Sequence, residues 1–166
     1  MNFLSPSQFG FRQNYSTYMA LSELYDYVSS AVDRNEYCAG IFIDLSKAFD
    51  TIDHSILLSK LEYYGIRGIT LCWFRSYLEC RKQFVSYNDS MAELKSITVG
   101  VLQGSMLGPL LFSIYINDIV DCSQVLKNIP FADDMNMLYS SKDYSSLMCT
   151  INNELDKVAD WFEANK

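Results

Sequence analysis

Apolar residues recur every three or four positions along several stretches of the chain, which is the spacing of one buried face of an α-helix. The first stretch runs from Thr17 to Arg34, and its apolar face is formed by Leu21, Leu24, Tyr25, Val28, Ala31 and Val32. The second covers residues 53–65, with Asp53 near the helix N-cap and Gly65 as the stop. These patterns predict two amphipathic helices.

Three further helices are predicted downstream. Residues 70–80 have an apolar face formed by Leu71, Phe74, Tyr77 and Leu78. Residues 105–119 are apolar almost throughout and predict a short buried helix, in which Pro109 is tolerable because it stands in the first turn. Residues 143–164 carry a stripe formed by Leu147, Ile151, Leu155, Val158 and Phe162.

Other stretches have the composition of β-strands. "CAGIFIDL", residues 38–45, is a continuous apolar run that predicts a buried strand whose last residue emerges at the sheet edge. Residues 82–101 predict a hairpin with its turn at Asn88-Asp89-Ser90. Residues 125–131 and 135–139 predict two short strands that meet at Ala132-Asp133-Asp134. The sum is an α+β fold, a small, mainly antiparallel sheet with helices packed on one face.

Composition adds limits to this fold. The 166 residues suit one domain, and 49% hydrophobic residues suffice for a core. The formal net charge is −7, from 13 basic and 20 acidic residues, which weakens nucleic-acid binding by the isolated chain but suits a cation site. The five scattered cysteines, with no CxxC pair, predict reduced and mostly buried thiols in an intracellular protein, and a single histidine argues against a zinc site.

No segment predicts membrane insertion or secretion. The N-terminus lacks the basic and long apolar regions of a signal peptide. The longest apolar run, "MLGPLLFSIYI", is too short to cross a bilayer and contains a proline. We therefore expect a protein of the cytoplasm or nucleus with no membrane partner.

Two adjacent carboxylates, Asp133 and Asp134, stand between the last two predicted strands in "IPFADDMNML". At a hairpin tip both can point to one side, where bound cations would relieve their repulsion. Asp44, at the end of the "GIFI" run, joins them if the strands are neighbours in one sheet. Three carboxylates at strand ends could hold two Mg²⁺ ions about 4 Å apart for phosphoryl transfer. The simpler alternatives are turn chemistry for the pair and a loop cap for Asp44.

The ordered motifs of the chain resemble those of reverse transcriptases. "FADD" is similar to their Tyr/Phe-x-Asp-Asp motif. "IFIDLSKAFDTIDHSILLSKLEYYGIRG" and "GVLQGSMLGPLLFSIYINDI" resemble the first catalytic motif and the Pro-Gln-Gly motif of non-LTR (LINE-type) retrotransposons, and "LSPSQFGFRQNYST" resembles the stretch before the first helix. The resemblance covers nearly all of the chain and implies a polymerase palm-like fold with RNA-directed DNA polymerase activity.

The resemblance also implies a role for each matching position. Asp44 and Asp133 would be the principal ligands of two Mg²⁺ ions, with Mn²⁺ as an alternative, and Asp134 the third carboxylate. The implied nucleotide-binding positions are Leu45 through its carbonyl, Phe49 as a steric gate, Gln103 and Gly104. A core phenylalanine and a plain strand-to-helix turn are the structural alternatives for Phe49 and for the Gln103 loop. The implied partners are an RNA template, a DNA primer and dNTPs.

Several side chains near these motifs have simpler interpretations. Lys47 and His54 are expected to be solvated groups at a helix end, and Arg12 a surface arginine. Arg81 and Lys82 precede the predicted hairpin. For this pair surface charge is the default expectation, with contact to a nucleic-acid backbone as the alternative.

The chain departs from the family in extent and at three positions. As one domain spanning residues 1–166, it would be truncated at both ends, without some fingers strands and the thumb that grip nucleic acid. Leu102 replaces a usual proline, which should loosen the nucleotide-binding loop. Pro130 should remove a ladder bond from the catalytic hairpin, and Met135 replaces a small polar residue. A catalytically inactive retrotransposon remnant or a co-opted binding module is therefore the alternative function, and an RNA-templated RNA polymerase is a weaker third.

Overall fold

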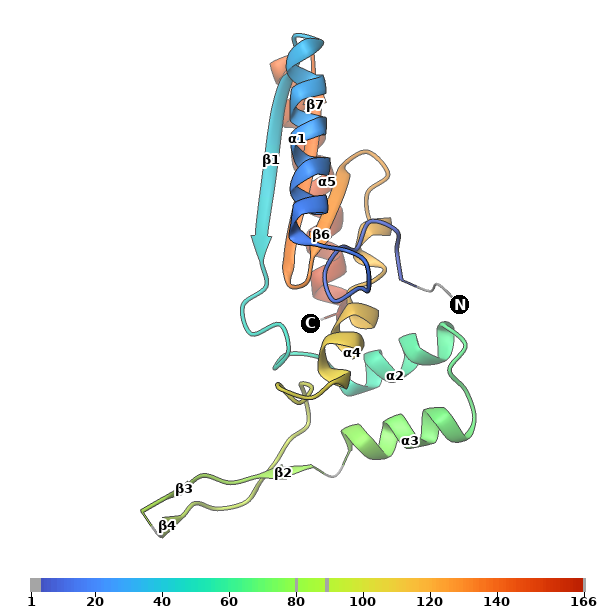
Figure 1. Cartoon of the computed structure of the whole chain (residues 1–166), viewed down its shortest axis with the longest axis vertical. Coiled ribbons are helices and arrows are strands. Elements are labelled where there is room, and N and C mark those ends of the chain that lie inside the picture. Colours follow the sequence, from blue (N-terminus) through green and yellow to red (C-terminus); the bar gives the residue numbers. More distant parts are fainter. Residues whose placement is uncertain (1–3, 80, 89, 166) are drawn as a thin grey trace. The chain divides into compact units, whose positions relative to one another are not determined.

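The computed structural model describes residues 4–79, 81–88 and 90–165 (Figure 1). The chain divides into two compact units. The first unit comprises residues 1–48 and 116–166, and the second comprises residues 49–115. Each unit is described by itself below.

A three-stranded antiparallel sheet is the centre of the first unit. Its strands, in the order β1-β7-β6, are β1 (Tyr37–Asp44), β7 (Asp134–Ser141) and β6 (Lys127–Phe131). β1 pairs with β7 over its full length, from Tyr37 opposite Ser141 to Asp44 opposite Asp134. The two-residue turn 132–133 joins β6 to β7. The predicted strands on either side of the Asp-Asp pair are therefore confirmed.

Helices cover both faces of this sheet. α1 (Thr17–Asp33) packs through Ala20 and Leu24 on the face that holds Ile129 and Leu138. α5 (Tyr144–Asn165) packs on the opposite face, where Val158, Trp161 and Phe162 meet Met135 and Met137. Met137 and Leu138 are neighbours in β7, and side chains alternate along a strand, so the central strand is apolar on both sides. The α+β class with a small antiparallel sheet is confirmed, whereas the prediction of helices on one face is wrong.

β1 is an edge strand with none of its residues fully buried. Phe42 is 67% exposed although it lies in the middle of the apolar run. The prediction of a buried strand is wrong here, because β1 has a neighbouring strand on one side alone within the described sheet.

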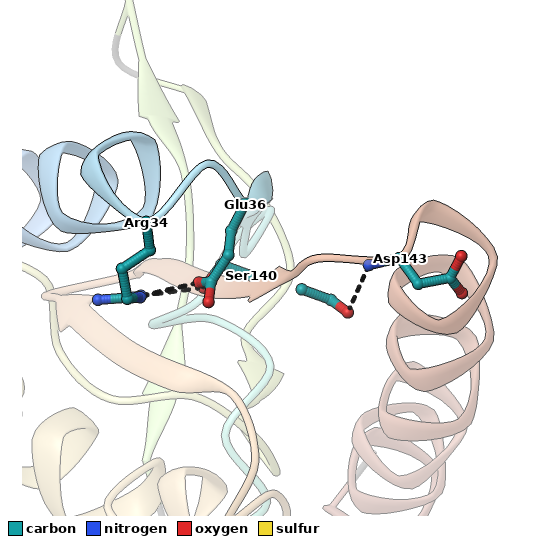
Figure 2. Close-up of polar contacts among 5 residues, drawn as sticks. Arg34, Glu36, Ser140 and Asp143 are labelled. Carbon is teal, nitrogen blue, oxygen red and sulfur yellow. Dashed lines mark hydrogen bonds and ion pairs between the residues drawn. The ribbon is translucent and has the colours of Figure 1, made fainter.

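A polar cluster closes the end of the sheet farthest from Asp44 (Figure 2). Arg34, at the end of α1, contacts Glu36 at 2.9 Å, and the Ser140 hydroxyl of β7 donates to the same carboxylate at 2.8 Å. The hydrogen bond from Arg34 is the main reason why the pKa of Glu36 lies below its usual value, with Ser140 second. The cluster thus connects α1 to the β1–β7 ladder.

The second unit contains three helices and a narrow ribbon. The helices are α2 (His54–Tyr63), α3 (Ile69–Leu78) and α4 (Leu107–Tyr115). The ribbon strands are β2 (Lys82–Gln83), β3 (Ser86–Tyr87), β4 (Ser90–Met91) and β5 (Lys95–Ser96). All three predicted helices and the predicted hairpin are confirmed. Asp89 of the predicted turn lies outside the described residues.

Local signals set the limits of α2. The Asp53 carboxylate accepts hydrogen bonds from the backbone N–H groups of Ser55 at 2.8 Å and Ile56 at 3.1 Å, so it caps the helix as predicted. The Ser55 hydroxyl also donates to it. Gly65 follows the last turn with φ of 91°, a left-handed conformation that glycine adopts without strain.

The cysteines are less buried than expected. No disulfide joins the four described ones, of which Cys38 and Cys122 are partly buried and Cys72 and Cys149 are exposed. The reduced state stays a prediction, the expectation that most cysteines are buried is wrong for these four, and Cys80 lies outside the described residues. Among the described helices, none has both the length and the apolar character that a membrane crossing requires.

Candidate active site

The strand register of the first unit brings two of the three predicted catalytic carboxylates together. Asp44, the last residue of β1, lies directly opposite Asp134, the first residue of β7. Directly opposite residues of an antiparallel pair present their side chains on the same face. Asp133 stands one position earlier, in the turn that leads into β7. The three residues therefore occupy one end of the sheet, although 89 positions separate Asp44 from Asp133.

The chemistry of these donors suits a hard divalent cation, because carboxylate oxygens are the ligands that Mg²⁺ and Mn²⁺ prefer. The geometry is less complete. Within the described residues, no group of three or more His, Cys, Asp or Glu side chains is arranged to hold a metal ion. The Leu45 carbonyl, another implied ligand, accepts a hydrogen bond from the Ala48 N–H at 3.1 Å. This end of the sheet thus supplies ligands of the right chemical type, and two of them, Asp44 and Asp134, lie directly opposite each other.

The turn that carries Asp133 is braced by the N-terminal segment. The Phe9 N–H donates to the Pro130 carbonyl at 3.0 Å, and the Gln8 side-chain oxygen accepts from the Gly10 N–H at 2.8 Å. A Cβ added to Gly10 would lie 2.0 Å from the backbone nitrogen of Ala132. Gly10 is therefore required for close approach, because any side chain would push the segment away from the turn.

Pro130 does not break the β6–β7 hairpin. β6 continues through it, and Pro130 lies opposite Met135 in the ladder. Its carbonyl points to Phe9 and so away from β7. Since the N–H and C=O of a strand residue point to the same side, an N–H at this position would also face away from β7. The expectation of a lost ladder bond is therefore wrong, and proline is tolerated at an outward-facing position of an edge strand.

In the second unit, a backbone pairing positions the Gln103 loop. The N–H groups of Gly100 and Val101 donate to the carbonyls of Ile52 and Phe49, both at 2.7 Å. The buried His54 ring donates from Nε2 to the Gly100 carbonyl at 2.7 Å. The prediction that His54 is solvated is wrong, because its imidazole fixes this loop from inside the unit.

Gln103 and Gly104 follow this pairing directly. The Gln103 side-chain amide donates to the Asp50 carboxylate at 3.1 Å, and both side chains are exposed. Gly104 has φ of 79°, and no other atom lies within 4 Å of the position that its Cβ would take. The left-handed backbone is thus the reason for glycine at this position within the described structure.

Ser105 then fixes the start of α4. Its hydroxyl donates to the Leu102 carbonyl at 2.8 Å and accepts from the Gly108 N–H at 2.9 Å. These two bonds hold the loop on both sides of Gln103 in the absence of the usual proline. The loosening expected from Leu102 stays a prediction.

The ring of Phe49 packs against Phe112 of α4, with 5.0 Å between the ring centroids. This contact accounts for its partial burial and fits the core alternative; the steric-gate role stays a prediction. Near it, a cavity of about 570 Å³ is lined by Asp50, Arg81, Gln83, Leu102 and Gln103, among others. A pocket of this size accommodates a small ligand.

The sequence interpretation missed two contributors. Asp50 has no role in the sequence-based interpretation, yet it accepts the hydrogen bond from Gln103. The sequence feature that points to it is a carboxylate directly after Phe49 in "KAFD". Gly10 was not singled out either; the signal was a glycine between two phenylalanines in "QFGFR". Asp44, Leu45, Asp133 and Asp134 belong to the first unit, and Phe49, Gln103 and Gly104 to the second.

Comparison with known proteins decides the family. The family model described as "Reverse transcriptase (RNA-dependent DNA polymerase)" matches residues 1–166. The chain belongs to the reverse transcriptase family. It is 34% identical over 172 residues to the probable RNA-directed DNA polymerase from transposon BS of Drosophila melanogaster, covering 95% of this chain and 18% of that protein.

Other similarities agree with this membership. The RNA-directed DNA polymerase from the mobile element jockey of Drosophila melanogaster is 33% identical over 164 residues, which cover 94% of this chain and 18% of that polymerase. This reverse transcriptase chain therefore spans about a fifth of the length of these relatives. Among solved structures, telomerase from Candida tropicalis in complex with a fragment of telomeric RNA matches with a TM-score of 0.66 and 13% identity, over 89% of this chain and 27% of that one. The likeness confirms the palm-like fold.

Proposed function

We propose that this chain forms the palm of an RNA-directed DNA polymerase and that Asp44, Asp133 and Asp134 are its catalytic carboxylates. The observation that carries the proposal is the register of Asp44 opposite Asp134, with Asp133 in the adjoining turn. These positions are also the ones at which the motifs match the family. The names of the Drosophila relatives, which are RNA-directed DNA polymerases, support the reaction class.

In this proposal the three carboxylates would bind divalent cations at one end of the sheet. Two Mg²⁺ ions would lower the pKa of the attacking primer hydroxyl and stabilise the leaving pyrophosphate. Asp44 and Asp133 would be the principal metal ligands, Asp134 would be the third carboxylate, and the Leu45 carbonyl would add an oxygen ligand. The substrates are a DNA primer, an RNA template and dNTPs.

Within the second unit, taken by itself, Phe49, Gln103 and Gly104 would be the positions that contact a nucleotide. Gln103, held by Asp50, presents its amide at the rim of the 570 Å³ cavity, and Gly104 leaves space beside it. Phe49 would exclude a ribonucleotide 2′-hydroxyl. Its packing on Phe112 would give the ring the rigidity that such a steric gate needs.

A non-catalytic remnant or binding module is the second candidate. The specific observation in its favour is that, within the described residues, the acidic side chains do not converge as a group of three. The outward orientation of Pro130 removes one argument for it, since the hairpin keeps its ladder.

Primer extension separates the two candidates. In the assay, the chain replaces the matching region of the jockey polymerase, and extension of a DNA primer on an RNA template by this chimera is measured with Mg²⁺. Asp133→Asn should lower the rate more than about 100-fold, because a group that stabilises developing charge is lost. Asp26→Asn makes the same change on the exposed face of α1 and should leave the rate unaltered. Equal extension by both variants, or none by the unaltered chimera, would support the non-catalytic candidate.

A further inference from the structure

The ribbon of the second unit, residues 81–97, exposes several apolar side chains. Tyr87 is 74% exposed and Val85 is 70% exposed. A two-stranded ribbon without a covered face is only marginally stable in water. Exposed apolar groups gathered on one element are typical of a binding surface.

The pairing pattern assigns the ribbon side chains to two faces. Gln83 lies opposite Lys95, and Ser86 lies opposite Met91, so residues 84–85 face the three residues 92–94. The extra residue is a β-bulge in the second strand, and the first strand keeps its alternation. One face, which we call the Tyr87 face, includes Arg81, Gln83, Val85, Tyr87 and Lys95. The opposite face carries Lys82, Phe84 and Met91, which lies opposite Ser86.

The Tyr87 face continues into the candidate nucleotide site. Arg81 and Gln83 line the 570 Å³ cavity together with Asp50 and Gln103. From this cavity, strand alternation leads along one side of the ribbon through Val85 to Tyr87. A ligand strand that enters the cavity thus has a continuous path along the ribbon.

The charge on this path fits a polyanion. The ion pairs formed by the described residues involve none of Arg81, Lys82 and Lys95, although the chain as a whole has a net charge of −7. The Arg81 guanidinium lies 5.5 Å from the centroid of the Tyr77 ring, which fixes it at the base of the ribbon. Basic groups next to exposed aromatic rings are the pattern of single-strand nucleic-acid binding. The cores of protein interfaces, by contrast, are depleted of lysine.

We propose that the Tyr87 face binds a single-stranded nucleic acid, which is the RNA template under the function proposed above, on which this inference rests. A base stacks on Tyr87, Arg81 and Lys95 contact phosphates, and Gln83 offers an amide beside the cavity. The bulge increases the local twist of the ribbon, so the strand follows a curved path into the cavity.

Fluorescence anisotropy with a labelled single-stranded RNA, without Mg²⁺ or dNTPs, tests the proposal on the 166-residue chain. Tyr87→Ala should weaken binding about 5- to 150-fold. Lys95→Gln should lower the slope of log affinity against log salt by about 0.7. Phe84→Ala and Lys82→Gln are the matched controls on the opposite face and should bind as the parent does. All four side chains are exposed, and circular dichroism checks that each variant is folded.

The possible results are distinct. Loss of affinity confined to Tyr87→Ala and Lys95→Gln supports the proposal, and photocrosslinking of a 4-thiouridine RNA to Tyr87 supports it without any mutation. Equal effects on both faces, no effect on either, or no RNA binding by the parent chain overturn it. A single-stranded DNA of the same sequence tests whether the surface prefers RNA or DNA. Binding of DNA but not of RNA also overturns the assignment to the RNA template. Asp133→Asn should bind RNA as the parent does. A loss of primer extension can therefore be distinguished from a loss of RNA binding by the Tyr87 face.

Discussion

Replacing Gly10 by alanine should displace the N-terminal segment that packs against the turn containing Asp133. The new Cβ would lie 2.0 Å from Ala132 N and 2.6 Å from Ala132 Cα, whereas real Cβ contacts under 3.0 Å are essentially absent. The N-terminal segment or the turn must therefore move by at least about 1 Å, because both neighbours are backbone atoms of the two-residue turn and cannot rotate away as a flexible side chain would.

The expected magnitude combines two effects. Overpacking of a closed site costs about 1–3 kcal/mol. The shift also stretches the hydrogen bond from Phe9 N–H to Pro130 O, now 3.0 Å long, and its loss costs about 1 kcal/mol. We expect Gly10→Ala to lower the free energy of unfolding of the first unit by about 2–4 kcal/mol, and its melting temperature by about 10–30 °C.

The assay follows urea unfolding through Trp161. The chain has two tryptophans, and changing the exposed Trp73 to Phe leaves Trp161, which packs on the core of the first unit, as the reporter. Gly40→Ala is the matched control in the same sheet. Its added Cβ would meet flexible side-chain ends, Phe42 at 3.0 Å and Leu138 at 3.3 Å, so we expect a change within about 1 kcal/mol. A Gly10→Ala protein within about 0.5 kcal/mol of its parent, or no less stable than Gly40→Ala, would refute the close-approach reasoning.

Three other predictions follow from the same structure. Asp53→Ala should lower stability by about 1 kcal/mol at pH 7 in urea titrations, because α2 loses its cap. The hydrogen bond from Ser55 lowers the pKa of Asp53, so this contribution is present above its unfolded pKa of about 3.9 and disappears as the pH falls through the folded value; a difference that persists at about pH 2 would contradict it. Pro130→Val should change the urea-derived stability by less than about 1 kcal/mol, and a larger gain would mean that its N–H does join the ladder. Gln103→Ala and Asp50→Ala should be non-additive in dNTP affinity of the jockey chimera, and strict additivity would show that their hydrogen bond has no part in positioning Gln103.

The elements that follow from local sequence were predictable. The spacing of apolar residues in Thr17 to Arg34 gave α1 within one residue of its observed end at Asp33, and Asp53 and Gly65 marked the limits of α2. Such signals depend on the residue and its immediate neighbours, so a single sequence contains them.

Features that depend on tertiary position were not predictable in the same way. An apolar run such as β1 is typical of a buried strand, and only the strand order places it at an edge. Whether Pro130 removes a ladder bond depends on which side its backbone faces, and the Phe9 contact decides that. His54 has a polar side chain, yet the Gly100 carbonyl gives it a partner inside the second unit.

The candidate site was predictable in composition but not in geometry. The motif positions indicated Asp44, Asp133 and Asp134, and the β1–β7 register then put Asp44 opposite Asp134. The Asp50 to Gln103 hydrogen bond spans 53 positions and had no local signal strong enough to predict it.

The most direct test of the central claim is a Mg²⁺ titration of the 166-residue chain followed by its melting temperature. If Asp44 and Asp133 bind the catalytic metal, the melting temperature of the parent chain and of Asp26→Asn should rise with Mg²⁺ concentration, because a ligand that binds the folded state stabilises it. Asp44→Asn and Asp133→Asn should show no such rise. An equal rise in all four proteins, or none in the parent, would contradict the claim that this end of the sheet is a metal-dependent catalytic centre.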